Sequence, residues 1–221
     1  MPNQLKAGAI LTYVTLFLNS AIGLIYTPFL TLKLGQAEYG LYSLVASVVG
    51  SLTVLDFGFG NALIRYTAKL RAEKKDQKLK EMYGMFFIIF CGIALLALII
   101  GLLVYFNTEN IFSQNMTSEE LRKMKIMLLL MVFNLCFTFV MSVYRSIIVA
   151  YERFIFQKVI NLIRIVLNPL VMVIFLLFGY KAITMVVLQT IFNVLTLLAD
   201  YYYCKRKLNI QFVFGKFDSA F

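Results

Sequence analysis

Several charged side chains interrupt apolar stretches of this sequence, and their types favour binding of an anion or of a coupling ion. The stretch VLDFGFGNALIRY (54–66) holds Asp56 and Arg65, and VINLIRIVLNP (159–169) holds Arg164. A guanidinium presents a planar fork of donors that matches phosphate or carboxylate oxygens. A carboxylate in such a place can bind an ion or can neutralise a nearby arginine. Because a charge among apolar groups is costly, these residues are candidates for function.

Bond-making chemistry is not indicated by the sequence. Histidine is absent, which removes the commonest metal ligand and proton shuttle. The cysteines Cys91, Cys136 and Cys204 stand far apart and suggest neither a disulfide framework nor a metal cluster. No nucleophile–base pair is recognisable, so we predict a protein that is not an enzyme and that uses no metal or cofactor.

The elements that carry the charged residues are predicted to be membrane helices. The 221 residues are 61% hydrophobic and 14% charged, whereas an ordinary soluble domain is roughly half apolar and a quarter charged. A membrane helix needs about 20 mainly apolar residues. The prediction is an all-α membrane protein, in which residues 1–203 form one six-helix lobe and residues 204–221 form a cytoplasmic tail or the start of a linker. The predicted spans are residues 8–34, 39–67, 82–106, 124–150, 158–178 and 182–203.

The distribution of basic residues predicts the orientation of these helices. With the N-terminus inside, most of the 21 Lys and Arg residues lie on the cytoplasmic side, notably in the basic loop KLRAEKKDQKLKE (69–81). This bias favours both termini in the cytoplasm. The net charge of +10 then represents membrane-surface charge, and nucleic acid is not an expected partner.

The depth of each charged residue separates structural from functional explanations. Arg65 and Arg145 lie near the inner ends of their helices and could snorkel to the surface. Arg164 is expected about 9 Å deep, and Asp56 about 16 Å from the inner end of its helix, at 1.5 Å per residue. A short aspartate cannot snorkel, so Asp56 is predicted to be the acid least able to reach water.

Asp56 and Arg65 cannot pair on a straight helix. They are separated by about half a turn at 3.6 residues per turn. Either each has another partner, Arg164 being one for Asp56, or Gly58 and Gly60 allow the helix to bend here.

Polar residues at spacings of three and four form stripes on five of the six predicted helices, which indicates faces turned away from lipid. Such stripes can simply help helices to pack, or they can line a polar cavity. The stripes include Asn19 in the first helix; Asn134, Thr138, Ser142 and Arg145 in the fourth; Gln157, Asn161, Arg164 and Asn168 in the fifth; and Gln189, Asn193, Thr196 and Asp200 in the sixth.

Two long stretches resemble a known family. LTLKLGQAEYGLYSLVASVVGSLTVLDFGFGNALIRYTAKL (30–70), with its turn at Gly35, Tyr39, Gly40 and Tyr42, is similar to the N-terminal signature of the oligosaccharide flippases. YERFIFQKVINLIRIVLNPLVMVIFLLFGYKAITMVVL (151–188) resembles their fifth helix and the turn into the sixth. These are polysaccharide-biosynthesis membrane proteins of the multidrug/oligosaccharidyl-lipid/polysaccharide exporter superfamily.

The resemblance implies transport of undecaprenyl-pyrophosphate-linked oligosaccharide across the bacterial cytoplasmic membrane by alternating access. Cationic cavity residues would engage the pyrophosphate, and the polar stripes could accept sugar hydroxyls. The substrate-binding residues expected here are Asn19, Arg65, Arg145, Asn161 and Arg164. Asp56 is expected to couple an ion or to pair with an arginine.

Such transporters have two six-helix lobes, whereas this chain holds one, so a second lobe or a partner chain is expected. Two other functions stay open. One is export of drugs or cations, as in the multidrug branch of the same superfamily. The other is a non-transporting membrane subunit of a polysaccharide assembly complex.

Overall fold

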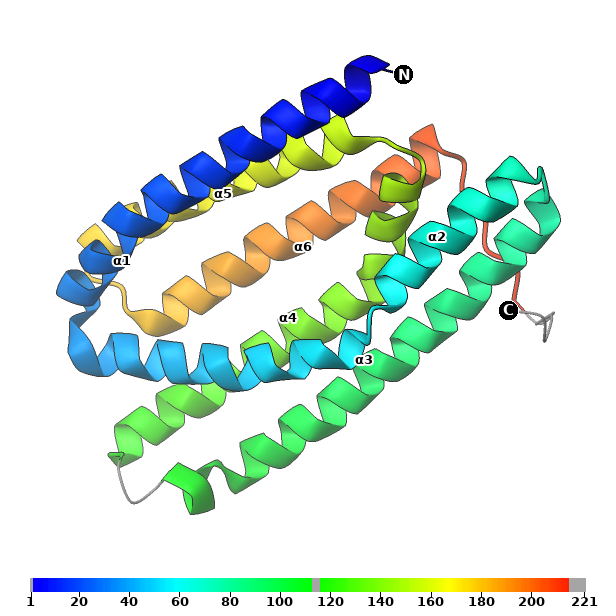
Figure 1. Cartoon of the computed structure of the whole chain (residues 1–221). Coiled ribbons are helices and arrows are strands. Elements are labelled where there is room, and N and C mark those ends of the chain that lie inside the picture. Colours follow the sequence, from blue (N-terminus) through cyan, green and yellow to red (C-terminus); the bar gives the residue numbers. More distant parts are fainter. Residues whose placement is uncertain (1, 113–115, 215–221) are drawn as a thin grey trace.

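The structure, a computed structural model, describes residues 2–112 and 116–214, which form helices joined by short connections (Figure 1). No strand occurs in these residues, which confirms the predicted all-α class. The helices are α1 (Pro2–Leu52), the 3-10 helix η1 (Thr53–Asp56), α2 (Phe59–Ala72), α3 (Asp76–Phe112), α4 (Ser118–Ala150), α5 (Phe154–Leu177) and α6 (Ala182–Lys207).

Five helical runs of the described part are long and apolar enough to cross a membrane. The prediction of six separate spans is not confirmed, because residues 10–72 form one run by this measure. Within α1, however, Gly35 has non-helical angles (φ 78°, ψ 164°), and Figure 1 shows limbs of different direction on its two sides. Glycine adopts a positive φ easily because it lacks Cβ. Separate crossing by the two limbs, residues 2–34 and 36–52, stays a prediction.

The predicted span over residues 39–67 is not one continuous helix, because the chain breaks at Phe57 and Gly58. Helix η1 ends at Asp56, and both Phe57 (φ 46°) and Gly58 (φ 75°) are left-handed. A residue with Cβ adopts this conformation at a cost of roughly 1–2 kcal/mol, whereas Gly58 does not bear that cost. The bend that VLDFGFG allows is therefore found, but no ion pair joins Asp56 to Arg65 among the described residues.

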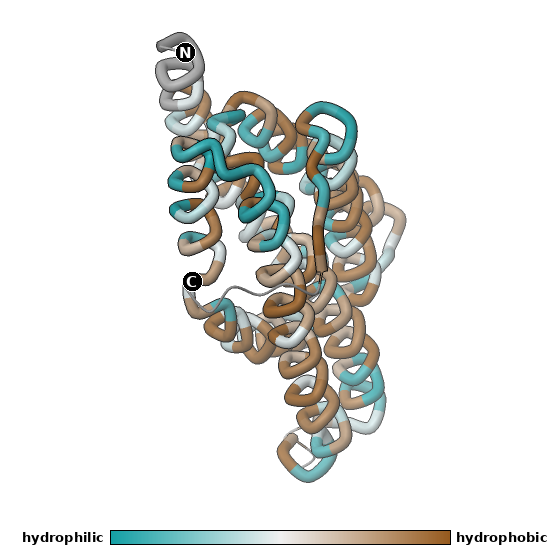
Figure 2. The backbone as a smooth tube through the Cα atoms, turned by 90° about the vertical axis from the view of Figure 1, so that its right-hand side faces the viewer, coloured by the Kyte–Doolittle hydropathy of each residue, from teal (hydrophilic) through white to brown (hydrophobic). Residues whose placement is uncertain are grey.

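The polar connections are shorter than the sequence predicts, because charged residues extend the helices beyond their apolar parts. Helix α2 runs to Ala72 and α3 begins at Asp76, inside the predicted basic loop. Helix α4 begins directly after Thr117, which forms a capping box with Glu120. Figure 2 shows hydrophilic residues gathered at the α2–α3 corner and at the opposite end near the start of α4, with hydrophobic helix between them.

Packing divides the helices into two unequal groups. The most extensive contacts join α3 to α4, α4 to α6, and α1, through its first limb, to α5 (Figure 1). The larger core is built around α3 and α4, with Phe90, Met127 and Ile147 among its fully buried side chains. A small separate cluster, Leu30, Met172, Leu176 and Met185, joins α1 and α5 to α6. Helix α5 and the first limb of α1 therefore form a layer, and α5 also joins the rest at its other end, where the Phe156 ring stacks on that of Tyr203 (3.9 Å) and Gln157 donates to the carbonyl of Arg145 (2.7 Å).

The chain after α6 packs on the helical bundle. We call residues 208–214 the C-terminal strap. Its Val213 N–H donates to the carbonyl of Lys80 (3.2 Å), and the Phe212 ring lies 6.1 Å from that of Tyr83 and 5.5 Å from that of Tyr144. The Val213 carbonyl approaches α3 at Gly84, where a Cβ would collide with it. The described part of the predicted tail is thus fixed against α3 and α4, and residues 204–207 still belong to α6.

Candidate functional site

The polar stripes of α4, α5 and α6 meet at Arg164. The Nη1 of Arg164 donates a hydrogen bond to Oδ1 of Asn193 (3.1 Å). The Nδ2 of Asn193 donates to Oδ1 of Asn134 (2.5 Å) and to Oγ1 of Thr138 (2.8 Å). These four residues, the Arg164 network, tie three helices together through neutral groups and one cation. Asn193 is 8% exposed, so its amide needs these partners.

Arg164 lines two pockets, one on each side of it. The larger, about 440 Å³, lies between the first limb of α1 and α5, and its polar lining is Asn19, Tyr26, Asn161, Arg164 and Asn168. The smaller, about 260 Å³, lies among the second limb of α1, η1, α4 and α6 and includes Thr53, Asn134, Thr138, Gln189 and Asn193. One guanidinium can therefore reach ligands on two faces of α5.

The larger pocket contains an unused acceptor. The Oδ1 of Asn168 is buried and has no hydrogen-bond partner among the described residues. A buried amide oxygen without a partner is unfavourable, and a hydroxyl or water in the pocket would satisfy it. Tyr26 across the pocket donates its hydroxyl to Sδ of Met172 (2.8 Å). Amide and guanidinium groups are suited to hydroxyl-rich or anionic ligands.

The structure brings three of the five predicted substrate-binding residues together. Asn19, Asn161 and Arg164 line the larger pocket. Arg65 and Arg145 are exposed and line neither pocket.

The expectation that Asp56 is the acid least able to reach water is wrong. Asp56 ends η1 and is partly exposed, whereas Asp200 on α6 is 3% exposed. No ion pair joins Asp56 to Arg164 in the part of the chain that the structure describes. The helix break turns the chain near Asp56, so a depth calculated along a straight helix does not apply to this residue.

Two features of the site were not singled out from the sequence. Asn193 connects Arg164 to α4, and Asp200 is the most buried of the described acids. Both belong to the predicted stripe of α6, and Asn134 and Thr138 belong to that of α4. The polar residues of α4 and of α6 recur at similar spacings along their helices. This shared spacing is the sequence signal that could have predicted the contact between the two stripes.

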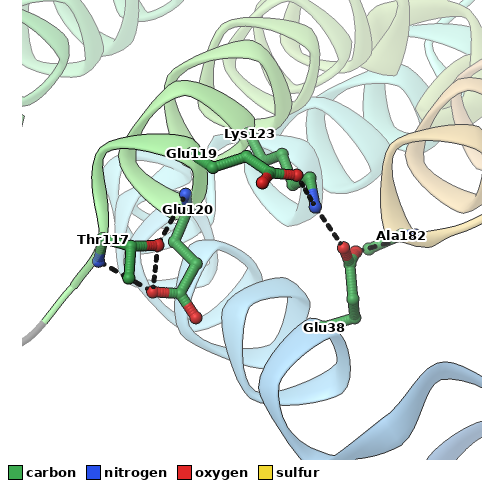
Figure 3. Close-up of polar contacts among 6 residues, drawn as sticks. All are labelled: Glu38, Thr117, Glu119, Glu120, Lys123 and Ala182. Carbon is green, nitrogen blue, oxygen red and sulfur yellow. Dashed lines mark hydrogen bonds and ion pairs between the residues drawn. The ribbon is translucent and has the colours of Figure 1, made fainter.

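A second polar cluster lies at the end of the molecule where α4 and α6 begin (Figure 3). Lys123 contacts Oε1 of Glu38 (2.6 Å) and Oε1 of Glu119 (2.9 Å), and the other oxygen of Glu38 accepts from the N–H of Ala182 (3.4 Å). We call these four residues the Glu38 cluster. The side chains of Glu38 and Lys123 are 12% and 18% exposed. Because Glu38 follows the kink at Gly35, the cluster fixes this kink to the starts of α4 and α6.

Comparison with known families identifies the chain. Residues 5–220 match the family of polysaccharide biosynthesis proteins. The chain belongs to this family. No curated protein and no solved structure matches it. This membership and the five apolar helical runs together support a multi-pass membrane protein and confirm the resemblance seen in the sequence.

Proposed function

We propose that this polysaccharide biosynthesis protein is one lobe of a flippase. It moves oligosaccharide repeat units, linked to undecaprenyl pyrophosphate, across the bacterial cytoplasmic membrane. The supporting observation is the position of Arg164 between two polar pockets in an otherwise apolar bundle. A cation there provides a binding site for pyrophosphate, and the amides around it provide partners for sugar hydroxyls. The family's place in polysaccharide biosynthesis favours this substrate over drugs or cations.

In this proposal a second lobe is needed because transport takes place by alternating access. Transporters of this kind rock two structural repeats about a shared site. Helix α5 and the first limb of α1 line the larger pocket, so in this proposal they are the part of the lobe that moves. The second lobe, from the same chain or from a partner chain, would close the pockets on their open side.

A flipping assay tests the proposal directly. The protein, together with its second lobe, is placed in sealed vesicles that carry a fluorescent lipid-linked oligosaccharide, and outward movement is followed with a membrane-impermeant lectin. We expect movement that depends on the protein and loss of polymer, without drug sensitivity, when the gene is deleted. Drug sensitivity with normal polymer would favour multidrug export. Co-purification with glycosyltransferases, without any lipid movement, would favour an assembly subunit.

The proposed orientation places both termini and the basic α2–α3 corner in the cytoplasm. Single cysteines at Gln77 and Asn110, in a background without native cysteines, report the two sides. We expect an impermeant maleimide to label the Asn110→Cys variant in sealed cells and the Gln77→Cys variant only after lysis. The reverse pattern would invert the orientation.

A further inference from the structure

The hydrogen bonds of the Arg164 network run in one direction, and this fixes the orientation of the Asn193 amide. A guanidinium only donates, so the atom of Asn193 that faces Arg164 must be Oδ1. Its Nδ2 therefore points to α4, where Oδ1 of Asn134 and Oγ1 of Thr138 accept. Thr138 gives its own proton to the main-chain carbonyl of Asn134 (2.7 Å), which leaves its oxygen free to accept.

The acceptor that holds Arg164 is neutral, and this is unusual for a half-buried arginine. A carboxylate at position 193 would also hold the guanidinium, but it would cancel the charge. Among the described residues, Arg164 makes one hydrogen bond to protein, while a guanidinium has five N–H donors. Most donors therefore remain for a ligand in the two pockets that Arg164 lines.

We infer that Asn193 is a positioning residue for anion recognition: it orients the Arg164 guanidinium toward the pockets while leaving its positive charge available. This inference rests on the proposed function and assigns the geometry of its anion site to a residue on α6 and to its two acceptors on α4. A movement of α6 relative to α5 changes the geometry of the Arg164–Asn193 bond, and this links anion affinity to the arrangement of the helices.

The test measures binding of farnesyl pyrophosphate to the full-length chain in detergent by calorimetry, with farnesol as the uncharged reference. We expect the wild type to bind the pyrophosphate and to bind farnesol much more weakly.

The Asn193→Leu variant keeps the charge of Arg164 but not its orientation, so its affinity for farnesyl pyrophosphate should fall about threefold. The Asn193→Asp variant should lose at least about thirtyfold, because the new carboxylate stays ionised beside Arg164 and competes with the ligand. Asn107→Asp, the same change on α3 outside both pockets, is the matched control and should bind like the wild type.

The outcomes separate positioning from simple structural support. Equal losses in Asn193→Leu and Asn193→Asp, in proportion to the loss of folded protein, would overturn the inference. If the aspartate variant does not fold, Thr138→Val removes one acceptor behind Asn193. It should then lower the preference for farnesyl pyrophosphate over farnesyl monophosphate, and an unchanged preference would also overturn the inference. A wild type that does not prefer the pyrophosphate to farnesol would refute the anion site of the proposed function itself.

Discussion

The Arg164 network and the Glu38 cluster each join three helical segments, but they treat charge in opposite ways. In the Glu38 cluster two carboxylates surround the ammonium of Lys123, so the positive charge of the lysine is neutralised within the protein. In the Arg164 network the cation meets only amide and hydroxyl groups. A cation neutralised by protein carboxylates stabilises an arrangement of helices, whereas a cation without a carboxylate attracts an anion. This difference is the reason why the proposed substrate site is the Arg164 network.

The largest difference is expected when each cation is neutralised. Arg164→Gln should reduce export of lipid-linked oligosaccharide at least about hundredfold, because the charge-assisted bonds to the ligand are lost. Arg164→Lys should restore only part, since lysine keeps the charge but loses the planar fork. Lys123→Gln should leave export within about twofold, as the lysine is already neutralised by protein. Export is measured as polymer per amount of folded protein in the membrane. Equal loss in the two glutamine variants would remove the distinction.

Stability, in contrast to export, should depend on the ion pair of the Glu38 cluster. A double-mutant cycle of Glu38→Gln and Lys123→Met should give a favourable coupling that is larger than that of the exposed Glu73–Lys75 pair, because the side chains of Glu38 and Lys123 are less exposed. Unfolding in mild detergent, followed by circular dichroism, measures it. A coupling near zero would mean that Glu38 and Lys123 do not stabilise the kink at Gly35.

A smaller loss is expected at the start of α4. Thr117→Ala removes the hydroxyl that accepts from the Glu120 N–H and also contacts the Glu120 carboxylate, and loss of an N-cap costs about 1 kcal/mol. The same unfolding measurement applies, with Thr31→Ala on the exposed side of α1 as the control. A loss no larger than that of the control would show that the cap does not support the nearby cluster.

The smallest effect should come from Glu73→Gln at the α2–α3 turn, which tests whether burial decides the strength of an ion pair. Glu73 lies 2.7 Å from Lys75, but their side chains are 35% and 53% exposed. Lys75 holds the pKa of the Glu73 carboxyl below its ordinary value. Any stabilisation is therefore present above the ordinary pKa of about 4.3 and is lost as the pH falls through the lower folded value. We expect no measurable change in stability at pH 7. A loss similar to that of the Glu38 pair would show that burial is not the deciding factor.

Local spacing in the sequence was enough to predict part of the site. The stripes of α5 and α6 placed Asn161, Arg164 and Asn193 on inward faces, because helical periodicity is a local property. The break at Phe57 could not be predicted in the same way, since a left-handed phenylalanine opposes its own preference. The Glu38 cluster was missed because Glu38 lies 85 and 144 residues from Lys123 and Ala182. Such pairings depend on how distant helices come together.

The C-terminal strap has a consequence for the order in which the protein matures. Helices α3 and α4 leave the ribosome long before residues 208–214. The rings of Tyr83, Phe87 and Tyr144 therefore gain their contacts with the Phe212 ring only late in synthesis. These contacts depend on prior insertion of α6, which carries the strap to Gly84. Docking of Phe212 and Val213 therefore takes place only after all the helices that the structure describes have been synthesised.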